Sequence, residues 1–171
     1  MVLDHQKIEG GAITIEYSQN ITSVEGLRSL RAIKGKDSAG YSLFVGHNAA
    51  LASLKGLRNL AGDLPGALDV QNNSKLVSLH GLEGITAVGG AYTNKYGGYS
   101  LFVQSNPLIT DLEGLRGIKG ELPGSLMIGY NDALRSLRGL EGITGINGKD
   151  VRGDSLTIDR NARLPSLKGL E

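Results

Sequence analysis

The sequence contains no cysteine and no tryptophan, and it has only two phenylalanines among its 171 residues. The absence of cysteine excludes disulfide bonds, thiolate metal ligands and cysteine nucleophiles. No apolar run approaches the roughly 18 residues of a membrane-spanning helix, so we expect no direct membrane insertion. With 18 basic and 17 acidic residues, the chain lacks the excess positive charge that attracts nucleic acid, and we expect no nucleic-acid partner.

Catalytic motifs are also missing from the sequence. It has no G-x-S-x-G, no Walker phosphate loop and no H-E-x-x-H pattern, each of which carries a defined chemistry. The three histidines, His5, His47 and His80, fall at different positions of the repeat described below, so their spacing indicates no metal site. We therefore expect a protein that is not an enzyme and that needs no metal or other cofactor.

What the sequence does contain is a repeat, [A/S]-Φ-x-Φ-x-x-N-x-x-Φ-x-S-L-x-G-L-x-x-Φ, in which Φ is aliphatic. Two apolar residues two positions apart are typical of a strand with one buried face. The copies start 25 to 33 residues apart (43 to 68 and 68 to 101 are the extremes), a spacing that predicts a solenoid. The first aliphatic residues of the six copies, which we number as coils one to six, are Ile13, Leu43, Leu68, Leu101, Leu126 and Leu156.

The repeat predicts a mainly β protein, a single repeat domain over residues 1–171 built as a solenoid of about six coils. Residues 1–11 are either the remnant of a preceding coil or an N-terminal cap. No polar capping coil is visible at either end, although solenoids usually carry caps. The open ends are therefore expected to be covered by further coils or by another subunit.

Two positions of the repeat are predicted to be structural. Stacked asparagine amides can satisfy backbone groups of neighbouring coils at a sharp corner; the residues are Asn48, Asn73, Asn106, Asn131 and Asn161. A glycine that recurs at one phase predicts a turn or a close approach that a Cβ would obstruct; the residues are Gly26, Gly56, Gly81, Gly114, Gly139 and Gly169.

Segments such as SLFVGHNAALASLKGL and SLTIDRNARLPSLKGL resemble the receptor L-domain family, relatives of leucine-rich repeats. The resemblance covers about residues 8–171 and is to the cysteine-free microbial or algal type. It implies a right-handed parallel β-helix, a role in recognising a ligand, and an extracellular or cell-surface location.

Candidate partner-binding residues lie at strand positions that are expected to face outward. An exposed apolar and aromatic patch on a sheet would bind a protein or a glycan. The alternative interpretation is that a loop covers these side chains. The residues are Phe44, Phe102 and Met127, between the two buried aliphatic residues, and Tyr17 and Tyr130, further along their strands.

A second candidate surface consists of the long corners of coils one, three and five, at residues 33–42, 88–100 and 146–155. Tyrosines in loops rich in glycine and serine are typical of binding surfaces, although long loops are also where insertions are tolerated. The last corner carries Arg-Gly-Asp-Ser, which resembles an adhesion motif. The candidate residues are Tyr41, Tyr92, Tyr96, Tyr99, Arg152 and Asp154.

The leading functional hypothesis is thus a non-catalytic recognition module that binds a protein or glycan partner through the strand face and the long corners. The alternative is a structural or assembly subunit, or a spacer, that acts through its open solenoid ends.

Overall fold

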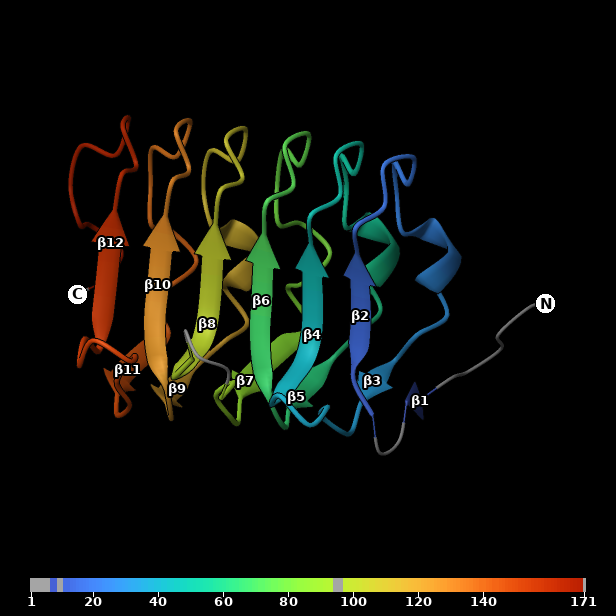
Figure 1. The fold of residues 1–171 in the computed structure, drawn as a ribbon, viewed down its shortest axis with the longest axis horizontal. Helices are drawn as coiled ribbons and strands as arrows, with labels where there is room; N and C mark the ends of the chain where they lie inside the picture. The colour runs from blue at the N-terminus through green and yellow to red at the C-terminus, as the bar shows by residue number, and fades with distance from the viewer. Residues whose placement is uncertain (1–6, 9–10, 94–96, 171) are drawn as a thin grey trace.

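The computed structural model describes residues 7–8, 11–93 and 97–170 of the chain (Figure 1). The protein is mainly β and forms a parallel β-solenoid of about six turns, as predicted. In Figure 1 each turn ascends a front strand, passes over the top, descends behind the sheet and returns to the next strand on the left. This path makes the coil right-handed, in agreement with the usual hand of parallel crossovers.

The front wall of the solenoid is one six-stranded parallel sheet in the order β12-β10-β8-β6-β4-β2. Its strands pair in register, so that the first aliphatic residue of each coil lies opposite that of the next coil. The six strand positions predicted from the repeat are therefore confirmed. The strands are β2 (Ile13–Glu16), β4 (Tyr41–Gly46), β6 (Ala67–Gln71), β8 (Tyr99–Gln104), β10 (Ser125–Gly129) and β12 (Leu156–Asp159).

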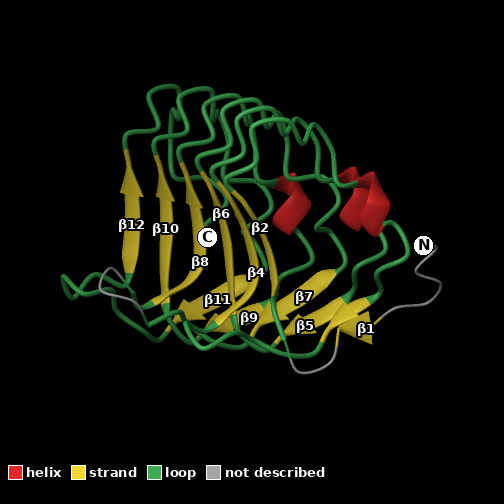
Figure 2. Ribbon diagram, turned by 45° about the vertical axis from the view of Figure 1, so that its right-hand side comes forward, coloured by secondary structure: helices red, strands yellow, loops and turns green. Residues whose placement is uncertain are grey.

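The rear wall is less regular and consists of short strand pairs and 3₁₀ helices (Figure 2). The pairs are β1 (Lys7–Ile8) with β3 (Ala32–Ile33), β5 (Gly62–Leu64) with β7 (Ile85–Val88), and β9 (Gly120–Leu122) with β11 (Ile143–Ile146). The helices are η1 (Glu25–Leu27), η2 (Lys55–Leu57) and η3 (Glu113–Leu115). None of the helices in the described part of the chain has the length and apolarity needed to cross a membrane.

Leucine, isoleucine and valine side chains fill the space between the two walls and form one continuous cluster. Leu43, Leu68 and Leu101, for example, are fully buried. The aliphatic positions of the repeat are less well buried in the two end coils: Leu156 and Leu167 of the last coil are 43% and 58% exposed, and Ile21 of the first coil is 39% exposed. No coil among the described residues stacks over Leu156 and Leu167.

The recurring glycine lies where each coil touches the coil before it. A Cβ on Gly56 would lie 1.9 Å from the carbonyl oxygen of Val24, and a Cβ on Gly139 would lie 1.9 Å from that of Leu112. The same conflict with the preceding coil arises at Gly81, Gly114 and Gly169. Glycine is needed here because a carbonyl group occupies the place of its side chain.

The asparagines form a hydrogen-bonded ladder inside the opposite corner. The Asn106 side-chain N–H donates to the carbonyl oxygen of Val70 at 2.9 Å, and its Oδ1 accepts a bond of 3.1 Å from the backbone N–H of Asn73. Each rung thus satisfies backbone groups of the coil before it. The other rungs, Asn48, Asn73, Asn131 and Asn161, repeat both bonds along the solenoid.

The residue before each ladder position adopts a left-handed backbone conformation, with φ between 51° and 58°, in all six coils. These residues are Tyr17, His47, Asn72, Ser105, Tyr130 and Arg160. This conformation costs a residue with a Cβ about 1 kcal/mol or more. It turns the chain sharply out of the sheet and sets the six side chains in a row at the upper end of the strands.

Candidate binding site

The long corners of coils one and five are built on the same aspartate turn. The Oδ1 atom of Asp37 accepts a hydrogen bond of 2.9 Å from the backbone N–H of Tyr41, four residues on. Asp150 makes the equivalent bond of 2.9 Å with the N–H of Asp154. Short aspartate side chains stabilise such turns by mimicking a backbone acceptor.

The long corner of coil three joins the other two. The backbone N–H of Thr93 donates to the carbonyl oxygen of Ala39 at 2.8 Å, and the hydroxyl group of Tyr99 donates to Oδ2 of Asp150 at 2.7 Å. The Tyr92 ring stacks on the Tyr41 ring with centroids 4.6 Å apart. The three long corners therefore form a connected row along the lower edge of the sheet rather than separate projections.

Above this row, an aromatic cluster covers part of the outer face of the sheet. It consists of Ala67, Tyr92, Tyr99, Phe102 and Met127, with Tyr41 packed against it. The Phe102 ring packs edge-on against the Tyr99 ring with centroids 4.9 Å apart. The cluster is a second, smaller core outside the solenoid.

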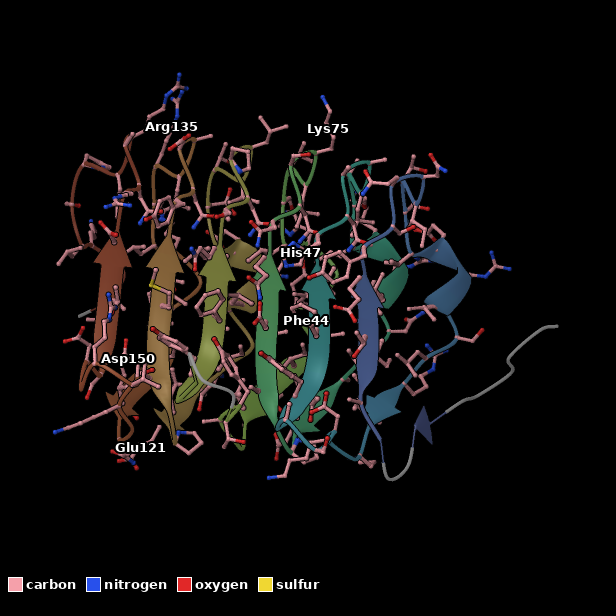
Figure 3. All side chains as sticks on the ribbon, viewed as in Figure 1. Phe44, His47, Lys75, Glu121, Arg135 and Asp150 are labelled. Carbon is pink, nitrogen blue, oxygen red and sulfur yellow. The ribbon has the colours of Figure 1, made fainter. Side chains whose placement is uncertain are left out.

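The expectation that Phe102 and Met127 are exposed is wrong. Both lie on the outer face of the sheet, but they are only 8% and 7% exposed because they pack in the aromatic cluster. Tyr92 and Tyr99, expected to project from a corner, are likewise buried. Phe44 remains partly exposed, and its ring lies over Gly46, where a Cβ would come within 2.6 Å of the ring (Figure 3).

Beside the cluster lies a cavity of about 400 Å³ that opens on the outer face of the sheet. It is lined by Tyr41, Gln71, Tyr92, Tyr99, Phe102, Gln104, Met127, Tyr130, Val151, Arg152, Thr157 and Asp159. Two rows of side chains cross its floor in strand register. One row is Phe102, Met127 and Thr157. The other row is Gln104 and Asp159, on either side of Gly129, which the Met127 side chain covers.

The cavity brings together residues that the sequence had assigned to two separate surfaces. Tyr41, Tyr92, Tyr99, Phe102, Met127, Tyr130 and Arg152 all line it. Tyr17, Phe44 and Asp154 do not line it, and Tyr96 lies outside the described residues. Tyr17 stacks instead on His47 at the far end of the sheet, with ring centroids 4.6 Å apart.

Five lining residues were missed by sequence reasoning: Gln71, Gln104, Val151, Thr157 and Asp159. Gln71, Gln104 and Asp159 occupy the second outward position of their strands, one residue beyond the second buried aliphatic. Glutamine at this position in two adjacent coils was a usable signal, because alternate residues of a strand share a face.

Arg152 forms one wall of the cavity and is held there by acidic neighbours. Its guanidinium group contacts Asp150 at 3.2 Å and Asp154 at 3.5 Å, and it donates to the Thr157 hydroxyl oxygen at 3.3 Å. The Arg152 and Asp154 side chains therefore turn toward each other within the Arg-Gly-Asp sequence. The adhesion role of this motif stays a prediction.

Asp150 is the buried charge that anchors this wall. Burial opposes its ionisation, but hydrogen bonds from Tyr99, from the backbone N–H of Asp154 and from Arg152 outweigh that effect and lower its pKa to about 2. Burial, together with the bond to Asp150, raises the pKa of Tyr99 to about 12. At neutral pH the pair is therefore a charged acceptor and a neutral donor, which fixes the junction of corners three and five.

Asp69 is a second buried carboxyl group, on β6 between Phe44 and Phe102 of the neighbouring strands. Its Oδ2 accepts a hydrogen bond of 3.1 Å from the side chain of Gln71. Its Oδ1 has no hydrogen-bond partner among the described residues. Burial raises the pKa of Asp69 well above its usual value, and the bond from Gln71 offsets only part of this rise.

We predict that Asp69→Asn stabilises the protein at pH 7 by about 1–3 kcal/mol, because it removes the cost of a buried and poorly paired carboxylate. The folded-state pKa of Asp69 lies above the unfolded value of about 4. The wild type therefore loses stability as the pH rises from about 4 through the folded-state pKa. Below pH 4 the stability difference between Asp69→Asn and the wild type should vanish. Chemical denaturation at pH 3 and pH 7 checks this, with exposed Asp132→Asn as control. An equal difference at both pH values would contradict the assignment.

Among the described residues no group of three or more histidine or acidic side chains is placed to hold a metal ion. Comparisons of the chain with protein-family models, with curated proteins and with solved structures found no match. The lining of the cavity offers aromatic rings, two amides, hydroxyl groups, a paired arginine and the Asp159 carboxylate.

Proposed function

We propose that the protein is a non-catalytic recognition module whose cavity side, between the long corners and β8, β10 and β12, binds a protein or glycan partner. The observation that carries the proposal is the cavity itself. It gathers aromatic and polar side chains from the strands and from all three long corners onto one surface. Aromatic and apolar side chains that converge with several polar groups on one hollow are typical of binding sites.

Membership of the receptor L-domain family is part of this proposal and rests on the repeat motif. The β-solenoid architecture agrees with it, since that family was expected to have this fold. An extracellular or cell-surface location is proposed on the same resemblance.

Preorganisation supports a recognition role. The cavity floor is packed before any ligand arrives, and Arg152 is already held by Asp150. Side chains that are fixed in advance lose little conformational entropy on binding. Tyr130 supplies the more exposed part of the rim, and the Arg160 guanidinium group lies 4.8 Å from the centre of its ring.

Tyr130 and Tyr17, which occupy the same position of the repeat, provide the test. We expect Tyr130→Ala to weaken binding by about tenfold or more, because the lost aromatic surface belongs to the cavity. Tyr17→Ala is the matched control: Tyr17 has the same left-handed backbone, is also exposed, and lies outside the cavity. The measurement is binding of wild type and both variants to arrays of purified secreted proteins and oligosaccharides.

The same measurement can also contradict the proposal. If wild type binds nothing on the arrays, or if both alanine variants lose the same affinity, the proposed recognition role of the cavity is wrong. Circular dichroism of each variant separates a loss of binding from a loss of folding.

A further inference from the structure

We infer that the cavity takes an uncharged saccharide of one or two sugar rings. This inference rests on the recognition function proposed above and names the class of ligand for that site. It follows from the size of the cavity, from the pairing of its charges and from the arrangement of its polar groups.

The size of the cavity limits the ligand. At about 400 Å³ it falls in the range of small-molecule sites, whereas a stable protein interface covers roughly 800 Å² on each partner. The Gln104–Asp159 row spans two strand spacings, which is about 10 Å. Such a site accommodates a short saccharide, or the terminal sugars of a longer glycan, rather than a protein loop.

Each charged side chain in the lining already has an oppositely charged partner within the protein. Arg152 is paired with Asp150 and with Asp154, and Asp159 lies 3.7 Å from Arg160. A phosphate, a carboxylate or an ammonium group would have to displace one of these partners. Ligands without charge are favoured because they leave the pairs intact.

The remaining polar groups suit hydroxyl groups. Gln71 and Gln104 lie side by side on β6 and β8, and each amide can both donate and accept a hydrogen bond. The Gln71 amide is already linked to Asp69. The Gln104 side chain has no hydrogen-bond partner within the described part of the chain. A saccharide supplies hydroxyl groups that can fill both roles at this amide.

The apolar part of the lining suits the other property of a sugar ring, its faces of C–H groups. Tyr92, Tyr99 and Phe102 line one side of the polar row with the small part of each side chain that the aromatic cluster leaves exposed, and aromatic rings pack against apolar groups. Gly129 lies between Gln104 and Asp159 in that row, and the Met127 side chain lies over it, with its terminal carbon 2.5 Å from the place of a Gly129 Cβ. A sugar ring between the amide and the carboxylate would therefore rest on the apolar end of Met127.

The test is a titration of the full chain with a defined panel: glucose, mannose, galactose, N-acetylglucosamine, cellobiose, maltose and lactose, with glucuronic acid and glucosamine as charged counterparts. Amide chemical-shift changes in ¹H–¹⁵N spectra give both affinity and location. We expect at least one neutral sugar to shift the amides of Gln71, Gln104 and Asp159, and the charged counterparts to bind more weakly.

The matched variants are Gln104→Ala and Gln19→Ala, because Gln19 is exposed and lies outside the cavity. Gln104→Ala should weaken binding about tenfold or more, since a hydrogen bond to the ligand is lost, and Gln19→Ala should leave it unchanged. The inference is overturned if no neutral sugar binds, if a charged sugar binds best, or if the two variants behave alike. A protein partner that depends on Tyr130 would then still support the recognition function, so the two failures are distinguishable.

Discussion

Gly56→Ala is expected to lower the free energy of unfolding by about 3 kcal/mol or more, because the new methyl group would collide with fixed backbone. The Cβ would lie 1.9 Å from the carbonyl oxygen of Val24 and 2.6 Å from the backbone nitrogen of Glu25. Neither atom can move without separating coil one from coil two. Chemical denaturation followed by circular dichroism measures the loss.

The same column contains its own control. Gly26 occupies the same place in η1 that Gly56 occupies in η2, but no described atom outside its chain neighbours lies within 4 Å of its Cβ position. Gly26→Ala should therefore change stability by less than about 1 kcal/mol. If both variants lose the same stability, contact with the preceding coil is not the reason for the glycine column.

Asn106→Ala is the second change with a large expected effect. It removes the bond to the Val70 carbonyl oxygen and the acceptor for the backbone N–H of Asn73, and both bonds are buried. Each buried polar group left without a partner costs about 1–3 kcal/mol, so we expect a total loss of about 3–4 kcal/mol. Thermal and denaturant unfolding would measure it.

Asn161 offers the graded comparison. It makes the equivalent bonds, to Ile128 and from Asn131, but it is only partly buried in the last coil. Water can replace the lost partners there, so Asn161→Ala should cost clearly less than Asn106→Ala. Equal losses would indicate that the ladder contributes through local turn geometry rather than through buried hydrogen bonds.

The solenoid could be predicted from the sequence because its determinants are local and repeated. An aliphatic pair two residues apart specifies a strand with one buried face, and six copies in phase specify the stacking. Leu43, Leu68 and Leu101 indeed lie opposite one another in the sheet. The repeat therefore contains enough information to predict which residues form the core of the inner coils, whereas Leu156 and Leu167 at the same positions of the last coil are exposed.

The outer face could be predicted only in part, because its covering depends on residues far apart in the sequence. Tyr92 packs on Tyr41, and Tyr99 bonds to Asp150 in a later corner. These corners differ from coil to coil, so no repeated pattern records their contacts. The sequence thus identified four tyrosines and one phenylalanine that meet at the cavity, Tyr41, Tyr92, Tyr99, Tyr130 and Phe102, while it placed Phe102 and Met127 in solvent.

The six residues with a left-handed backbone show a second feature that the sequence did not predict. Tyr17, His47 and Ser105 share one backbone conformation although their side chains have little in common. Their conformation follows from the corner that the neighbouring asparagine ladder holds, not from their own preferences. Tyr130 has the same backbone conformation, and it lies at the cavity rim because β10 pairs in register with β8 and β12.

The central claim, that recognition takes place at the cavity, is tested most directly by mapping a bound partner on ¹H–¹⁵N spectra of the wild-type protein. The partner is the array component or sugar that the protein retains. The account predicts that amide shifts concentrate on the outer residues of β8, β10 and β12 and on residues 150–155 of the adjoining corner. Shifts centred instead on the upper corners that carry Lys75 and Arg135 in Figure 3, or on the exposed Leu156 and Leu167 of the last coil, would contradict it.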